Sequence, residues 1–267
     1  MYRSPQDPER ITTTRVRRVR GTHETEVDDT LAVEEPLEIF AGGEPLAVIM
    51  RTPGHDEELA VGFLHGEGLL ANRSSLRSLG AWRDASGSLA ENRVTVEWQN
   101  ARPTAAAPRR FFATSSCGMC GKESIETALA LAPALEARIS VSPDVLYPLP
   151  DRLRAAQSVF QATGALHGAG LFDLEGNLLA AREDVGRHNA VDKLIGRALL
   201  DDALPLDHRI LLVSGRVSFE IVQKALVARI PVIAAVSAPT SLAVQVARRA
   251  NITLAGFLRD DQLNFYT

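Results

Sequence analysis

The sequence has very little cysteine: Cys117 and Cys120 are the only two in 267 residues. A disulfide between positions this close would close almost no loop and would therefore stabilise the fold very little. A structural disulfide framework is thereby excluded. The pair favours a reactive or metal-binding role in a reducing compartment, and we expect a cytoplasmic protein.

The sequence also lacks a long apolar run and an apolar leader. Its longest apolar stretch, 230–238, contains a proline and a serine and is too short to cross a bilayer. Residues 1–20 are polar and rich in arginine and threonine, without the apolar centre of a secretory signal. We therefore expect no membrane insertion.

An excess of positive charge is absent as well, because the formal net charge is −4. Proteins dedicated to nucleic-acid binding usually present a basic face, so we expect no nucleic-acid partner. The chain is 45% hydrophobic and long enough for one large domain or two modest ones, each with a hydrophobic core.

The first part of the chain has the pattern of a small α+β domain over residues 12–108, after a disordered lead-in at 1–11. A helix is predicted after the break at 52–54, because acidic residues occupy its first turn. The basic run at 15–20 is expected on the solvent face of an edge strand. Alternating or apolar segments predict strands at 13–19, 37–40, 46–50, 76–82 and 93–98.

Residues 109–150 are expected to hold the cysteine loop, a helix at 123–131 and a proline-rich connection at 143–150. Residues 151–267 then show the pattern of an α/β domain, beginning with a helix from Asp151 to residue 163. Apolar segments that alternate with helices predict parallel βαβ units covered on both faces. The strands are predicted at 171–173 and 178–181, joined as a hairpin, and at 210–213, 232–236 and 252–257. The helices are predicted at 190–200, 219–228 and 242–250.

Four polar loops follow strands of this domain, at 183–188, 214–218, 237–241 and 258–262. In open α/β sheets, ligands bind beyond the carboxyl ends of the strands, and free N–H groups at helix N-termini attract anions. Guanidinium groups are common partners of phosphate. We therefore predict a site for a phosphorylated, nucleotide-bearing ligand. Its candidate residues are Arg187, Ser214, Arg216, Ser237 and Arg259. The alternative is that the serines cap helices and the arginines are ordinary surface residues.

The cysteine pair precedes the predicted helix at 123–131, where the helix dipole and Lys122 favour the thiolate form. A structural zinc site is poorly supported, since only His167 and His188 are available to complete four ligands. A thioredoxin-like redox pair would follow a strand of a βαβ unit, but the predicted parallel units lie far downstream.

Two further interpretations concern catalysis. A zinc-dependent deaminase would carry His-x-Glu before its Cys-x-x-Cys, whereas here the cysteines come first and Ala169 stands where the glutamate belongs. A persulfide carrier needs a thiolate on a glycine-flanked loop and a second thiol that assists release by exchange. The spacing alone does not choose between persulfide transfer and redox chemistry.

The sequence resembles the FdhD formate dehydrogenase accessory sulfurtransferases over most of its length. Cys-Gly-Met-Cys-Gly at 117–121 is similar to the family's Cys-Gly-x-Cys-Gly loop. Glu-Asp-Val-Gly-Arg-His-Asn-Ala-Val-Asp-Lys at 183–193 is similar to its most distinctive segment. Five further segments match family motifs in the same order, at 34–37, 50–54, 57–64, 237–243 and 253–257.

This resemblance implies a sulfurtransferase that takes sulfur from a cysteine desulfurase. It passes the sulfur to the bis-molybdopterin guanine dinucleotide molybdenum cofactor, which formate dehydrogenase receives. A guanine nucleotide would mimic that cofactor. By resemblance Cys117 carries the persulfide, Cys120 is its companion, and the protein is a homodimer.

The resemblance also implies a cytidine deaminase-like, three-layer α/β/α fold for the C-terminal part. It places a cofactor-binding segment after the last strand, where Asp260 and Asp261 are more acidic than the family's usual residues. That segment comprises Phe257, Leu258, Arg259, Asp260, Asp261 and Gln262. Two alternatives stay open: a chaperone that binds cofactor or dehydrogenase without thiol chemistry, and a zinc-stabilised binding module.

Overall fold

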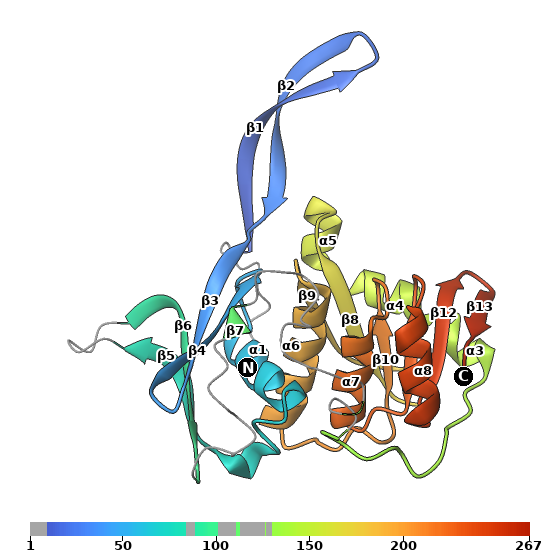
Figure 1. The fold of residues 1–267 in the computed structure, drawn as a ribbon. Helices are drawn as coiled ribbons and strands as arrows, with labels where there is room; N and C mark the ends of the chain where they lie inside the picture. The colour runs from blue at the N-terminus through green and yellow to red at the C-terminus, as the bar shows by residue number, and fades with distance from the viewer. Residues whose placement is uncertain (1–9, 84–88, 101–110, 113–125, 127–129) are drawn as a thin grey trace.

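The computed structural model describes residues 10–83, 89–100, 111–112, 126 and 130–267. Its strands form three sheets of two, five and six strands. Figure 1 shows the two-stranded sheet projecting from a body in which helices lie between and beside the two larger sheets. None of the described helices is both long and apolar enough to cross a membrane.

The projecting sheet, which we call the arm, consists of β1 (Ile11–Arg20) and β2 (His23–Ala32). The two strands pair antiparallel along their whole length, and all their residues are exposed or half-buried. The predicted strand at 13–19 is thus confirmed. Within the described part of the chain β1 pairs with β2 alone, so it is an edge strand as expected, and the acidic side chains of β2 face its arginines.

The five-stranded sheet has the order β5-β6-β3-β4-β7. The helix α1 (Asp56–Gly66) covers it, and buried side chains of α1 share one core with β3, β4 and β6. The strands predicted at 37–40 and 46–50 are confirmed as the antiparallel pair β3 and β4, and the predicted helix and the two later strands are confirmed as well. The strands are β3 (Glu35–Ala41), β4 (Glu44–Arg51), β5 (Leu76–Arg83), β6 (Leu89–Trp98) and β7 (Phe111–Phe112), with a short 3-10 helix, η1 (Arg73–Ser75).

The six-stranded sheet has the order β13-β12-β11-β10-β8-β9. The strands β10, β11 and β12 are parallel, as predicted, but β8 runs antiparallel to both β10 and β9, and β13 runs antiparallel to β12. The hairpin predicted at 171–181 is confirmed as β8 and β9, and with the antiparallel β13 it makes the sheet mixed. Its strands are β8 (His167–Phe172), β9 (Leu178–Asp184), β10 (Ile210–Val213), β11 (Val232–Ala235), β12 (Thr253–Arg259) and β13 (Gln262–Phe265).

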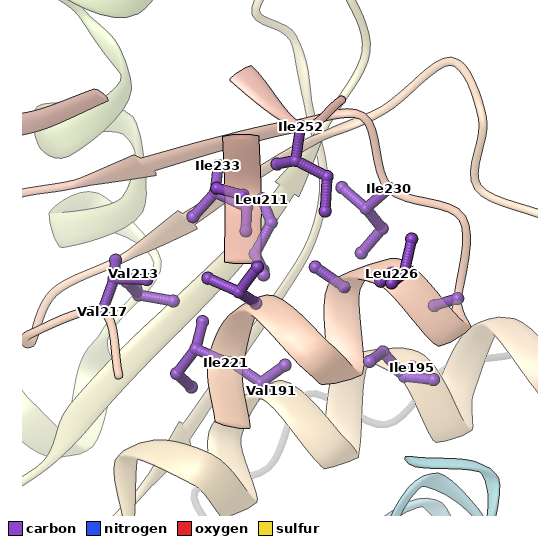
Figure 2. Packing of buried hydrophobic residues seen from close by; sticks show 14 of the residues in the cluster. Val191, Ile195, Leu211, Val213, Val217, Ile221, Leu226, Ile230, Ile233 and Ile252 are labelled. Carbon is purple, nitrogen blue, oxygen red and sulfur yellow. The ribbon is translucent and has the colours of Figure 1, made fainter. Parts of the chain in front are cut away.

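Helices cover both faces of this sheet, which confirms the three-layer α/β/α arrangement. On one face, α6 (Arg187–Leu200), α7 (Phe219–Val227) and α8 (Ser241–Arg249) form the larger core. Figure 2 shows isoleucine, valine and leucine side chains of that core packed between helices and strands. On the other face, α3 (Pro143–Leu146) and α4 (Leu149–Ala155) contribute to a second core. The short α5 (Ser158–Thr163) follows α4.

The proline-rich stretch at 143–150 is helical, which corrects its prediction as a connection. Ser142 caps α3, because its Oγ accepts a hydrogen bond from the Asp144 N–H at 3.3 Å. Proline suits the first turn of a helix, where its missing N–H has no partner to lose. Asp151 lies inside α4 and does not cap a single long helix. The helix α6 begins at Arg187, three residues before the predicted start at 190.

A close crossing of α1 and α6 joins the two larger sheets. A Cβ atom added to Gly62 would lie 1.9 Å from the Asp192 carbonyl oxygen, and one added to Gly196 would lie 1.8 Å from the Glu58 carbonyl oxygen. The two backbones therefore touch directly. Leu199 of α6 completes the core beneath the five-stranded sheet.

An ion pair supports the same joint. Arg182 of β9 donates two hydrogen bonds to the Glu58 carboxylate of α1, at 2.6 and 2.7 Å. Burial raises the pKa of Glu58, but Arg182 and His55 together outweigh it and lower that pKa to about 2. The predicted domain boundaries at 108 and 150 stay predictions; the structure adds that α1 and α6 pack the two parts together.

The crossing predicts that Gly62→Ala strongly destabilises the protein, since its methyl group forces the two helices apart. We expect the free energy of unfolding to fall by roughly 3 kcal/mol or more. Gly80→Ala is the matched control, because a Cβ at Gly80 meets nothing within 4 Å. Urea unfolding followed by circular dichroism measures both, and equal shifts for the two variants would contradict the account.

Candidate functional site at the carboxyl edge of the six-stranded sheet

One edge of the six-stranded sheet gathers the predicted loops. Because β9 and β10 are both antiparallel to β8, β9 runs in the same direction as β10, β11 and β12. The carboxyl ends of these four strands, and the start of β8 at His167, therefore lie at one edge. The parallel bridge between Val217 and Pro239 extends the pairing into the loops after β10 and β11.

Asp184, at the end of β9, is fully buried and organises the first of these loops. Its carboxylate lies 2.7 Å from Lys193 Nζ and accepts hydrogen bonds from the Gly186 N–H and Asn189 Nδ2, both at 2.8 Å. It also accepts one from the Thr52 N–H at 3.2 Å. Both oxygens of the carboxylate are therefore engaged by partners within the protein. Asp184 positions the loop and does not itself face a ligand.

Thr52, which follows β4, attaches this loop to the five-stranded sheet. Its hydroxyl accepts from the Val185 N–H at 3.2 Å, and its carbonyl accepts from Lys193 Nζ at 2.9 Å. Asn189 donates to the Met50 carbonyl at 2.8 Å. The first turn of α6 is therefore held by both parts of the chain.

His188 links the first turns of α6 and α7. Its Nε2 lies 2.8 Å from Ser218 Oγ and 2.9 Å from Glu220 Oε2. An ionised carboxylate only accepts hydrogen bonds, so this geometry places a hydrogen on Nε2. Sequence reasoning missed Glu220, because no local pattern connects it with a histidine 32 positions earlier.

His167 and Arg187 both lie close to Gly215. A Cβ at Gly215 would be 3.2 Å from His167 Nδ1 and 3.6 Å from Arg187 Cδ. Burial lowers the pKa of His167, and the positive charges of Arg187, His188 and Arg216 lower it further, with Asp184 opposing them. His167 is therefore favoured as the neutral ring, and the positive charge of this cluster comes from its arginines.

Ser214 and Ser237, which were predicted to contact the ligand, form hydrogen bonds to neighbouring strands and do not cap helices. Ser214 Oγ accepts from the Gly168 N–H at 2.9 Å, and the Ser214 N–H donates to the Gly168 carbonyl at 2.9 Å. The Ser237 carbonyl accepts from the Phe257 N–H at 3.2 Å. Both serines are half-buried at the edge, so their prediction as ligand contacts stays a prediction.

The predicted segment 257–262 is divided by the structure. Phe257 sits at an irregularity of β12 with a positive φ of 55° and 44% of its surface exposed. A positive φ strains a residue other than glycine and marks functional sites often enough to be informative. Leu258 is buried in the core, whereas Arg259, Asp260, Asp261 and Gln262 are exposed around the turn from β12 to β13.

Cys117 and Cys120 lie outside the described residues, as do Lys122 and most of the helix predicted at 123–131. The described strand before them, β7, pairs with β4 in parallel at Ala47 and Val48. Among the described residues, no three His, Cys, Asp or Glu side chains are grouped so that they could hold a metal ion.

Comparison with known proteins identifies the family. The sequence profile of the FdhD/NarQ family matches residues 32–267. The chain belongs to the FdhD/NarQ family. The match includes every loop of the sheet edge and begins at Ala32, the last residue of the arm.

Named relatives of this FdhD/NarQ protein are similar over nearly their whole length. "Sulfur carrier protein FdhD" of Streptomyces coelicolor is 49% identical over 259 residues, which cover 94% of this chain and 92% of that relative. The protein of the same name from Saccharolobus solfataricus is 42% identical over 253 residues, covering 94% and 93%. A solved structure of a candidate formate dehydrogenase accessory protein from Desulfotalea psychrophila shares the fold, with a TM-score of 0.75, 24% identity and 96% coverage of both chains.

The cluster around Gly215 predicts an unusually acidic titration of His167. In nuclear magnetic resonance titrations its pKa should lie below that of an unperturbed histidine, because charging it costs desolvation and repulsion from nearby cations. Arg216→Ala should move that pKa upward. An unchanged His167 titration in the variant would contradict the proposed charge cluster.

Proposed function

We propose that this chain is a sulfurtransferase that carries sulfur on Cys117 for the maturation of formate dehydrogenase. The observation that carries the proposal is its near-full-length similarity to proteins named sulfur carriers, in a chain whose only two cysteines form one Cys-x-x-Cys pair. Cys120 would assist release of the sulfur by thiol exchange.

The loading step needs no reagent beyond the donor. The Cys117 thiolate attacks the terminal sulfur of the persulfide on a cysteine desulfurase. A new S–S bond forms at Cys117 while the donor's S–S bond breaks, and the desulfurase cysteine leaves as a thiolate. The net result is transfer of one neutral sulfur atom, which the protein then passes to the molybdenum centre of its substrate.

The substrate proposed for the sheet edge is the bis-molybdopterin guanine dinucleotide molybdenum cofactor. Two arginines, Arg187 and Arg216, lie beside the first turns of α6 and α7, where helix N–H groups favour anions. Phe257 offers an exposed aromatic face further along the same edge. Phosphate groups and a flat base are the parts of a guanine dinucleotide that such a surface suits.

The proposed partners follow from this role. A cysteine desulfurase is the donor, formate dehydrogenase is the recipient, and a cytoplasmic location gives access to both. We also propose that the protein acts as a homodimer.

Sulfur loading is tested directly by intact mass spectrometry after incubation with a cysteine desulfurase and L-cysteine. The protein should gain the mass of one sulfur atom, and dithiothreitol should remove it. Cys117→Ala should abolish the gain, whereas Cys120→Ala should retain it. If a variant lacking both cysteines still activated formate dehydrogenase fully, the protein would instead be a binding chaperone without thiol chemistry.

Binding of the cofactor is tested with guanosine diphosphate as its mimic. Loss of one charged hydrogen bond costs about 1.5–3 kcal/mol. Arg187→Ala and Arg216→Ala should therefore each weaken nucleotide binding roughly tenfold or more in calorimetry. Arg209→Ala is the matched control, because Arg209 precedes β10 and so lies at the opposite edge of the sheet. Equal affinities for all three variants would count against the site.

A further inference from the structure

Two ion pairs join α6 and α7 beneath the carboxyl edge of the six-stranded sheet. In the first turns of the two helices, His188 Nε2 lies 2.9 Å from Glu220 Oε2. One turn further along both helices, Lys224 Nζ lies 2.7 and 2.9 Å from the two carboxylate oxygens of Asp192. Each helix thus contributes one acid and one base, four positions apart and therefore on one face. The first of these pairs spans the gap between the two helix N-termini.

Glu220 is a largely buried carboxylate that depends on this pair. Its side chain is 12% exposed, and its Oε1 is buried without a hydrogen-bond partner within the described residues. Its charge acts within the protein: burial lowers the pKa of Lys224, but the charges of Asp192, Glu67 and Glu220 outweigh it, and that pKa is raised. A buried carboxylate is costly when its donors are lost. The donor that His188 supplies therefore determines where this charge is held.

The same gap is the place proposed above for the diphosphate. Arg187 begins α6, and Arg216 lies two residues before Ser218, the N-cap of α7. A carboxylate is as good a partner for a guanidinium group as a phosphate is. If Glu220 turned toward either arginine, it would compete with the diphosphate for that arginine and would repel the phosphates. A site that binds anions here needs a device that restrains Glu220.

We propose that His188 is that device, a positioning residue that donates its Nε2 hydrogen to Glu220 and so holds the carboxylate away from the arginines. His188 itself does not contact the nucleotide, because its Nε2 is engaged within the protein. This inference rests on the cofactor site proposed above and explains how an acid is tolerated beside it. It is independent of sulfur transfer.

The first test compares two neutral amides at position 188. The amide nitrogen of glutamine reaches the place of His188 Nε2 and can donate to Glu220, whereas that of asparagine reaches only the place of Nδ1. In calorimetry with guanosine diphosphate, His188→Asn should weaken binding roughly fivefold or more, since the released carboxylate opposes the phosphates. His188→Gln should stay within about twofold of the wild type, since the donor is kept. Equal affinities of the two variants would overturn the proposal.

The second test removes the charge that His188 restrains. Glu220→Gln in the His188→Asn background should restore the affinity to within about twofold of the wild type, a coupling that a double-mutant cycle measures. A deficit that persists in the double variant would show a merely structural loss and would overturn the proposal. Glu220→Gln alone should bind at least as tightly as the wild type. Weaker binding by that single variant would also overturn the proposal, even if His188→Asn failed to fold.

The third test asks which part of the nucleotide is affected. Because repulsion and competition act on phosphate, the factor lost in His188→Asn should be larger for guanosine diphosphate than for guanosine monophosphate. Equal factors for the two nucleotides would place the effect on the base and would overturn the proposal. Urea unfolding followed by circular dichroism shows that each variant compared is folded.

The outcomes separate this inference from the proposed function. A wild type that binds guanosine diphosphate, with Arg187→Ala and Arg216→Ala weakened but no rescue by Glu220→Gln, would reject the role of His188 alone. A wild type that binds no nucleotide would reject the cofactor site and this inference with it. Sulfur loading from the desulfurase, measured by intact mass, should be the same in His188→Asn as in the wild type, so a failure to load would reject the sulfur transfer separately.

Discussion

The backbone contact between α1 and α6 is the constraint on which the rest of the structure depends. Gly62 and Gly196 allow each helix to lie against a carbonyl of the other, at a spacing that no side chain permits. This closeness places β4 beside the end of β9, so that Thr52 can bond to Asp184 and Lys193. The loop that begins α6 is thereby fixed by residues more than 130 positions apart.

That fixed loop determines what the sheet edge can bind. The Asp184 carboxylate pairs with Lys193 and accepts hydrogen bonds from backbone N–H groups, and the Glu220 carboxylate lies against His188 Nε2. Both acids therefore serve contacts within the protein. Arg187 and Arg216 lie beside Gly215, where the absence of a side chain keeps His167 and the guanidinium groups close. The carboxylates of Asp184 and Glu220 are engaged by contacts within the protein, and arginines lie at the N-termini of two helices. Together these features suit a bound anion.

Local chemistry explains which parts could be predicted from sequence. The strand at 210–213 was predicted with its observed ends, because four buried apolar residues between polar ones leave little choice. The helix α3 and the first two residues of α4 were missed because their prolines suggested a break, although proline fits a first turn. The strand β13 was missed because its polar residues lie on an exposed edge. An isolated glycine within each of two predicted helices indicated a close contact at that position. Which element each helix would contact could not be known without the fold.

A crystal structure of the protein with guanosine diphosphate tests the central claim most directly, because it shows where the nucleotide part of the proposed cofactor binds. The account predicts the diphosphate between the first turns of α6 and α7, within hydrogen-bonding distance of Arg187 or Arg216, with the base directed along the edge toward Phe257. A nucleotide bound on the five-stranded sheet, or on the helical faces away from this edge, would contradict it.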